Sequence, residues 1–242
     1  MRGRGLVLLC LVVSPARALA YRPFDQTDAD VAGPKEIEIE LGPVGFLHER
    51  GQSELTPGLV LNLGLARRLE GVIEGRAAIG LGSLSAGEER GTFEPALLLK
   101  CVLREGSLQE RSGPSVAAEA GLLLPALPGL AGTGGSLALI ASQRWREATL
   151  HVNAMAERTR DDQVDLAAGA IVEGPPEWRL RPVAEFWLER AGDEGTTSSA
   201  LGGAIWRARE GLSFDGAVRV APMPDRPAFE VRLGLTWTLS GS

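Results

Sequence analysis

The feature that most limits the fold of this sequence is an alternation of apolar and polar residues with a period of two. The clearest case is 36–41, where Ile37, Ile39 and Leu41 alternate with glutamates. Successive side chains of a β-strand point to opposite faces, so this segment should form a strand with one apolar and one polar face. Convincing helical periodicity is missing from the sequence. We therefore predict an all-β protein.

The same alternation recurs down the chain and predicts about twelve strands. Each is roughly 8 to 11 residues long, which fits a tilted membrane-crossing strand and exceeds the usual 5 to 6 residues of a soluble sheet. After 36–41, the alternating segments are 59–66, 73–79, 93–104, 116–124, 137–145, 150–156, 164–172, 178–188, 199–207, 212–220 and 229–239.

Connection lengths are an independent test. If both termini are periplasmic, long outer loops should alternate with short periplasmic turns. The expected outer loops are 42–56, 80–91, 125–134, 157–163, 190–198 and 221–227, and the expected turns are 67–70, 105–113, 145–149, 173–177 and 208–211. Most of the turns are the shorter connections, with 105–113 the exception. This pattern favours a single antiparallel up-and-down transmembrane β-barrel over a soluble sandwich.

Four tryptophans fall near the periplasmic strand ends in this arrangement: Trp145, Trp178, Trp206 and Trp237. Indoles favour the membrane–water boundary, where the ring is in an apolar environment and the N–H is hydrated. They therefore mark one boundary of a membrane. The other girdle is thin, since aromatic residues make up only 5% of the chain.

The N-terminus has the pattern of a secretory signal peptide. Arg2 and Arg4 precede the apolar run 6–13, and Ala18-Leu19-Ala20 has the small residues that a signal peptidase needs. The run is about half of the 20 residues that cross a bilayer as a helix, so a signal is favoured over an anchor. We predict cleavage after residue 20 and localisation in the outer membrane.

Residues 21–34 form an N-terminal segment ahead of the barrel domain, which we place at 35–242. The segment lacks alternation and is too polar to lie in lipid, so it either hangs in the periplasm or enters the lumen. Acidic lumen partners such as Glu185 and Glu230 favour the lumen, where the segment would narrow the passage. Its charged residues are Arg22, Asp25, Asp28 and Asp30.

The charged residues of the strands lie at the polar positions of the alternation. On the lipid face, a basic residue at midplane would cost about 2 to 4 kcal/mol. We therefore expect them to line the lumen, where both signs can pair across strands in a constricted passage. The alternative is that they only brace a closed scaffold. The expected pore-lining residues are Glu74, Arg76, Glu94, Lys100, Glu119, Arg144, Asp165, Arg181, Glu185, Asp215, Arg219, Glu230 and Arg232.

The stretch Arg22-Pro23-Phe24-Asp25-Gln26-Thr27-Asp28-Ala29, followed by Gly33 and by 36–42, resembles the N-terminal signature of outer-membrane transporters related to the "meta-pathway of phenol degradation" proteins. Pro57, Leu61, Gly64 and Leu65 look like the second strand of that family. The resemblance implies an outer-membrane barrel that moves small, often hydrophobic or aromatic, solutes. Its motif residues here are Arg22, Pro23, Phe24, Thr27, Asp28 and Ala29.

Candidates for catalysis are few. His48 falls in the first expected outer loop, and His151 shares the polar face of its strand with Asn153. A His–Asn pair without an adjacent serine is poor support for a nucleophile, so we expect a lumen hydrogen bond and no enzymatic activity. Cys101 has the lipid-facing parity and is expected to be an inert apolar filler.

Neither metal nor cofactor sites are expected, because no ligand cluster or phosphate loop has usable spacing. The acidic pairs Glu88–Glu89 and Asp161–Asp162 fit solvated loop charge better than divalent ions that bridge lipopolysaccharide. A formal net charge of −6 argues against nucleic acid as a partner.

Two function classes follow, with a third weaker one. The first is a channel or transporter for small solutes whose identity the sequence does not give, and the second is a non-transporting structural or ligand-binding outer-membrane barrel. The third is a soluble periplasmic β-barrel. The partners expected for the first two are outer-membrane lipid and the barrel-assembly machinery.

Overall fold

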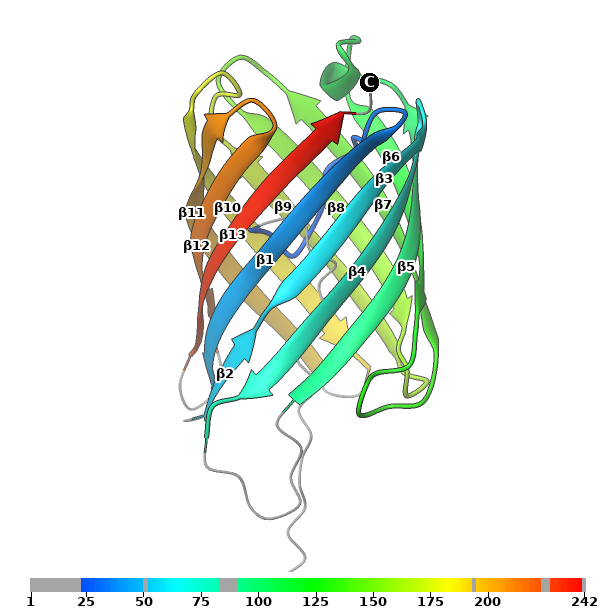
Figure 1. Cartoon of the computed structure of the whole chain (residues 1–242), viewed down its shortest axis with the longest axis vertical. Helices are drawn as coiled ribbons and strands as arrows, with labels where there is room; N and C mark the ends of the chain where they lie inside the picture. The colour runs from blue at the N-terminus through cyan, green and yellow to red at the C-terminus, as the bar shows by residue number, and fades with distance from the viewer. Residues whose placement is uncertain (1–22, 50–51, 83–90, 193–194, 223–226, 241–242) are drawn as a thin grey trace, which may run out of the picture.

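A computed structural model describes residues 23–49, 52–82, 91–192, 195–222 and 227–240. The expected signal peptide 1–20, Tyr21, Arg22, Glu88 and Glu89 lie outside these residues. The strands form one wall around a lumen (Figure 1). They are β1 (Glu36–Glu49), β2 (Gln52–Thr56), β3 (Gly58–Ala66), β4 (Leu69–Gly80), β5 (Gly91–Arg104), β6 (Ser115–Leu123), β7 (Gly134–Arg144), β8 (Thr149–Arg158), β9 (Val164–Glu173), β10 (Leu180–Ala191), β11 (Gly195–Arg209), β12 (Leu212–Ala221) and β13 (Ala228–Ser240).

The sheet is a closed antiparallel barrel with twelve strand positions. Each strand from β4 to β13 pairs with its neighbour in sequence, and β13 pairs back onto β1 from Glu36↔Ser240 to His48↔Phe229. β2 and β3 occupy one strand position, because both lie between β1 and β4 and are interrupted only at Pro57. The predicted all-β barrel of about twelve strands is confirmed.

The outer face of the barrel is apolar. Large hydrophobic side chains such as Leu137, Leu139 and Leu233 are exposed by 66%, 61% and 62%. Exposed apolar side chains on this scale are rare on soluble monomers but are what a lipid-facing wall needs. In the described strands, arginines with outward parity occur only at or next to the strand ends, and they are Arg104, Arg158, Arg190 and Arg209.

The prediction of a first outer loop at 42–56 was wrong. β1 continues to Glu49 and forms a hairpin with β2. A β-bulge between Leu41 and Val44 hides this continuation, because the extra residue inverts the inside–outside parity and breaks the alternation. Gly42 has a φ of +114°, and a Cβ there would lie 2.7 Å from the carbonyl oxygen of Leu233. His48 is consequently a strand residue on the outer face, where it bonds to Ser53.

Several strands also extend beyond their expected ends, up to 15 residues in β11. Glu70, Glu157 and Glu173 were assigned to connections but belong to β4, β8 and β9. The sequence prediction ended these strands too early, because glycine, proline or charged residues lie close to their ends. The connection 105–114 contains the one helix among the described residues, the 3₁₀ helix η1 (Ser107–Gln109). Within the described chain, no helix is long and apolar enough to cross a membrane.

The four tryptophans lie at one edge of the barrel. Trp206 pairs with Leu180 at the start of β10, and Trp237 pairs with Leu212 at the start of β12. Trp145 and Trp178 lie in the connections of the same edge, and all four side chains are exposed. Trp206 stacks on Phe214 with ring centroids 5.6 Å apart. Their position at the edge nearest the start of β1 agrees with the sequence prediction.

Candidate functional site in the barrel lumen

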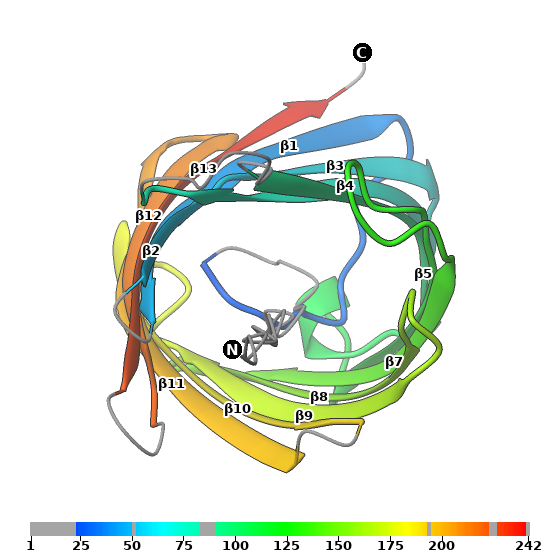
Figure 2. The same cartoon turned by 90° about the horizontal axis from the view of Figure 1, so that it is seen from below.

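Residues 23–34 lie inside the ring of strands (Figure 2). The segment has no strand or helix of its own, so its backbone groups need partners from the wall. Pro23, Phe24, Asp25 and Gln26 are buried, and Ala29 is fully buried further along. Two sets of lumen side chains provide these partners, one around Asp25 and one around Thr27 to Asp30.

The first set is an ion-pair cluster around Asp25. The Arg232 guanidinium donates to Asp25 Oδ1 at 2.7 Å and to the Pro23 carbonyl oxygen at 2.9 Å. Glu230 accepts from the same guanidinium at 2.8 Å, and Arg219 lies 3.2 Å from Asp25 Oδ2. Arg232 and Asp25 are both completely shielded from solvent. Because each charge has a partner, the cluster can exist in a buried environment.

Backbone hydrogen bonds and apolar contacts also hold the first half of the segment in place. One carboxylate, that of Glu185, accepts the backbone N–H groups of Asp25 and Gln26 at 3.0 and 3.1 Å. Phe24 is fully buried in a cluster with Ile171, Val183, Leu201, Ile205 and Ala217. Full burial of a phenylalanine contributes about 1.5 to 3 kcal/mol, so this side chain anchors the segment more strongly than a typical hydrogen bond of about 0.5 to 1.5 kcal/mol does.

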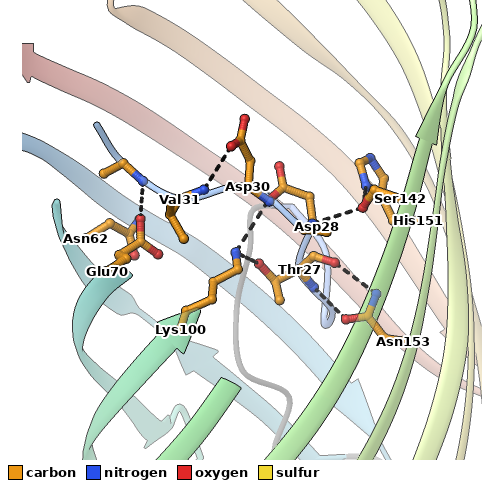
Figure 3. A network of polar contacts seen from close by, with 12 residues as sticks. Thr27, Asp28, Asp30, Val31, Asn62, Glu70, Lys100, Ser142, His151 and Asn153 are labelled. Atoms are coloured by element: carbon orange, nitrogen blue, oxygen red, sulfur yellow. Dashed lines mark hydrogen bonds and ion pairs between the residues drawn. The ribbon is translucent and has the colours of Figure 1, made fainter. Parts of the chain in front are cut away.

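The second set binds Thr27 to Ala29 (Figure 3). Asn153 donates to the Thr27 carbonyl at 2.9 Å and accepts the Thr27 N–H at 3.4 Å. The Lys100 ammonium donates to Thr27 Oγ1 at 3.0 Å and lies 3.4 Å from Asp28 Oδ1. Ser142 Oγ accepts the Ala29 N–H at 2.9 Å. These contacts come from β5, β7 and β8, so the segment bridges several strands of the wall.

Where the segment leaves the lumen, its backbone runs close to β3 and β4. Glu70 accepts the Ala32 N–H, and Glu36 accepts the Gly33 N–H at 2.8 Å. Gly64 has no Cβ, and a Cβ built there would collide with the carbonyl oxygen of Gly33. This glycine therefore lets the segment approach the wall.

The charges of the segment depend on the wall. Burial alone would raise the pKa of Asp25, but Arg219 and Arg232 outweigh it and lower the pKa to about 2. Burial opposes ionisation of Asp28 too, yet Lys100 and then His151 hold its pKa below the ordinary value. Asp30 behaves oppositely, since burial and the neighbouring Asp28 raise its pKa.

A cavity of about 280 Å³ remains between the segment and the wall of β1, β3, β4, β5 and β6. Its charged lining is strongly acidic, with eight carboxyl side chains and one ammonium, that of Lys100. The acidic residues are Asp28, Asp30, Glu36, Glu38, Glu40, Glu70, Glu74 and Glu119. The three glutamates of the first alternating segment thus form one side of the cavity.

The expected pore-lining residues occupy inward positions, but they do not form one site. Lys100, Glu119, Glu185, Asp215, Glu230 and Arg232 are buried, while Glu74, Arg76, Glu94, Asp165, Arg181 and Arg219 are half-buried. Arg144 differs, because it ends β7 at the rim and its side chain is exposed. Only Glu74, Lys100 and Glu119 line the cavity, whereas Arg219, Glu230 and Arg232 belong to the Asp25 cluster.

Ser142, which the sequence analysis missed, lies directly across from His151 in the β7–β8 pair. Its Oγ is 2.8 Å from His151 Nδ1, and His151 Nε2 is 3.5 Å from Glu173 Oε1. The turn 145–148 forces residue 142 opposite residue 151, so strict hairpin pairing of the two strands could have found it. The three residues are at most 3% exposed, and Ser142 Oγ already accepts the Ala29 N–H. Ser142 therefore holds the segment, and His151 and Glu173 lie behind it.

The remaining candidates from the sequence are Cys101 and the pair Asp161–Asp162. Cys101 is a half-exposed free thiol on β5 with the outward parity of Leu99 and Leu103. Asp161 and Asp162 are exposed in the connection after β8, where Asp162 pairs with Arg158. Among the residues that the structure describes, no group of three or more His, Cys, Asp or Glu side chains could hold a metal ion.

The barrel has the fold of outer-membrane channels. An outer-membrane channel from Pseudomonas putida F1 is similar with a TM-score of 0.67 and 11% identity, over 89% of this chain and 100% of the other. The KdgM porin in complex with disordered oligogalacturonate has a TM-score of 0.55 and 8% identity, over 83% of this chain and 98% of the porin. The sequence matches no protein-family model and no curated protein.

Proposed function

We propose that this protein resides in the outer membrane and is a channel for small solutes, with residues 23–34 narrowing its passage. The observation that carries the proposal is the charged lumen, in which a cavity of about 280 Å³ lies between the segment and the wall. A barrel that served only as a scaffold could fill this space with apolar side chains at lower desolvation cost.

Residence in the outer membrane is supported by the apolar outer face and the tryptophans at one edge. Outer-membrane lipid and the barrel-assembly machinery are the partners that such a location requires. The N-terminal pattern Ala18-Leu19-Ala20 supports export through a signal peptide.

For the solute, we propose a small molecule, and we infer membership of the transporter family related to the "meta-pathway of phenol degradation" proteins from the motif at 22–29. Similarity to the KdgM porin would favour oligogalacturonate, a chain of uronic acids. The acidic cavity argues against an anionic solute here, because like charges repel strongly in a poorly hydrated space.

The alternative is a non-transporting barrel, and the dense anchoring of the segment favours it. Asp25 and Arg232 are completely buried, so the segment does not leave the lumen without breaking an ion pair. A soluble periplasmic barrel fits poorly, since the apolar outer face would be in water.

Single-channel recording in planar bilayers separates the two membrane functions. We expect the intact protein to conduct weakly, and a variant that lacks 23–30 to conduct several times more. Liposome swelling with neutral solutes of increasing size then measures the passage. If neither protein conducts although both insert, the channel proposal is wrong and the non-transporting barrel holds. Equal conductance would mean that the segment does not narrow the passage.

A further inference from the structure

The acidic cavity contains two carboxyl side chains that make neither a hydrogen bond nor a close ion pair. Within the described residues, Glu119 on β6 makes no hydrogen bond or ion pair, although only 6% of it is exposed and it lines the cavity. Glu74 on β4 is in the same situation at a half-buried position. An unpaired carboxylate in a poorly hydrated space is costly, and a cationic partner beside it would remove that cost.

The other carboxylates of the cavity are occupied. Glu40 and Glu38 accept from the Asn62 amide at 2.8 and 3.4 Å, and Glu38 also accepts from the Thr238 hydroxyl at 2.9 Å. Glu70 and Glu36 accept backbone N–H groups of the lumenal segment. The two lining carboxyls without a hydrogen bond are therefore those on β4 and β6.

Lys100 shows which chemistry the cavity accepts. Its ammonium is the single positive group of the lining, and it is held by Thr27 Oγ1 and Asp28 Oδ1 at 3.0 and 3.4 Å (Figure 3). Lys100 is also paired with Glu119 in register across β5 and β6, yet its ammonium bonds to the segment and makes no hydrogen bond to the Glu119 carboxylate, on which it acts only through its charge. A second ammonium could therefore occupy the space beside Glu119.

The volume and the arrangement of ligands select the kind of cation. A cavity of about 280 Å³ has room for several waters or one small molecule, each water taking about 30 Å³. No described group of three acidic side chains is close enough together to coordinate a metal ion. Two carboxylates can instead bind primary ammonium groups through charge-assisted hydrogen bonds.

We propose that this cavity binds a small organic cation with primary ammonium groups, held by Glu119 and Glu74. The proposal names a solute class for the proposed channel and in that respect rests on it. Binding, however, is measured without transport. A protein that binds the cation but does not conduct would refute the channel and leave the binding site intact.

Isothermal titration calorimetry of the full chain in detergent micelles, at neutral pH and low salt, tests this with 1,5-diaminopentane as the probe. We expect saturable binding that weakens about tenfold or more in Glu119→Gln, since a charge-assisted hydrogen bond is lost. Glu74→Gln should weaken it similarly and serves as an independent variant if Glu119→Gln folds poorly. Glu189→Gln, a buried lumen carboxyl outside the cavity lining, is the matched control and should bind within about twofold of the native protein.

Glutarate, with the same carbon number and opposite charge, should not bind. Absence of saturable diamine binding would overturn the proposal, as would equal weakening in Glu119→Gln and Glu189→Gln. Competition by Ca²⁺ at equal concentration would replace the organic cation with a divalent metal and would equally overturn it.

Discussion

Arg232 on β13 and Asp25 in the lumenal segment form a completely buried ion pair, with Nη2 and Oδ1 2.7 Å apart across 207 positions of sequence. Arg232 also donates to Glu230 and to the Pro23 carbonyl. One guanidinium therefore connects the start of the segment to the last strand of the barrel.

Arg232→Met should release the start of the segment and leave the barrel folded. Breaking a buried pair by removing one partner costs about 3 to 5 kcal/mol, because Asp25 is left uncompensated. Hydrogen exchange at the amides of Asp25 and Gln26, which donate to Glu185, should accelerate by orders of magnitude. Arg181→Met is the control, since Arg181 pairs with Glu173 and not with the segment. Unchanged exchange in Arg232→Met would show that the ion pair does not hold the segment.

Gly64→Ala should displace the other end of the segment. A Cβ at residue 64 would overlap the carbonyl oxygen of Gly33, so either the segment or β3 must move. We expect greater protease sensitivity near Gly33 and higher conductance. Gly202→Ala is a matched strand control, because a Cβ at residue 202 meets no atom within 4 Å. Identical behaviour of the two variants would contradict close contact at Gly64.

Acid should loosen the segment. The pKa of Asp25 is lowered to about 2 from an ordinary value of 3.8. A lowered pKa means that Asp25 stabilises the docked state fully above pH 4 and loses this contribution as the pH falls towards 2. Asp28, whose pKa is also lowered, acts in the same direction, whereas the raised pKa of Asp30 gives a stabilisation that is lost as pH rises.

Exchange at the Asp25 and Gln26 amides, corrected for the intrinsic pH dependence, should therefore increase between pH 4 and pH 2. Asp25→Asn lacks the titrating group and should show a smaller pH response. An equal response in both proteins would assign the acid sensitivity to other groups.

Leu233→Arg should impair folding into bilayers. Leu233 is 62% exposed on the outer face of β13, where an arginine near midplane costs about 2 to 4 kcal/mol. Thr236 lies on the inward face of the same strand and faces Glu40 in register, so the Thr236→Arg variant should fold normally. The folded fraction in lipid vesicles, measured by heat-modifiable gel mobility, distinguishes them. Equal folding would mean that the outer face of β13 does not contact lipid.

Ser142→Ala should change the anchoring of the segment without changing any hydrolytic activity. The Ala29 N–H loses its acceptor, so exchange at this amide should accelerate. Native protein and variant should both leave short-chain p-nitrophenyl esters intact, because the Ser142–His151–Glu173 trio is buried. Ester hydrolysis by the native protein that disappears in Ser142→Ala would instead make the trio catalytic.

Strands, faces and the inward charges could be predicted because period-two alternation is a local property. Lys100 and Glu119 were identified as inward in this way, and so was the lipid-facing parity of Leu99. A short turn likewise determines the register of its hairpin, so the Ser142–His151 pair was within reach of the sequence. The bulge after Leu41 was not, because one extra residue erases the alternation on which the prediction depends.

The division of roles among the lumen carboxylates was decided only by the tertiary structure. Glu185 and Glu119 look alike in sequence, as acidic residues on the polar face of alternating strands. The path of the segment brings two backbone N–H groups to Glu185 and none to Glu119. That path depends on closing a loop of more than 200 residues to Arg232, and on which side chains fill the space that remains. Such long-range packing leaves no periodic trace in the chain, so the sequence determined the barrel and the tertiary structure determined the site.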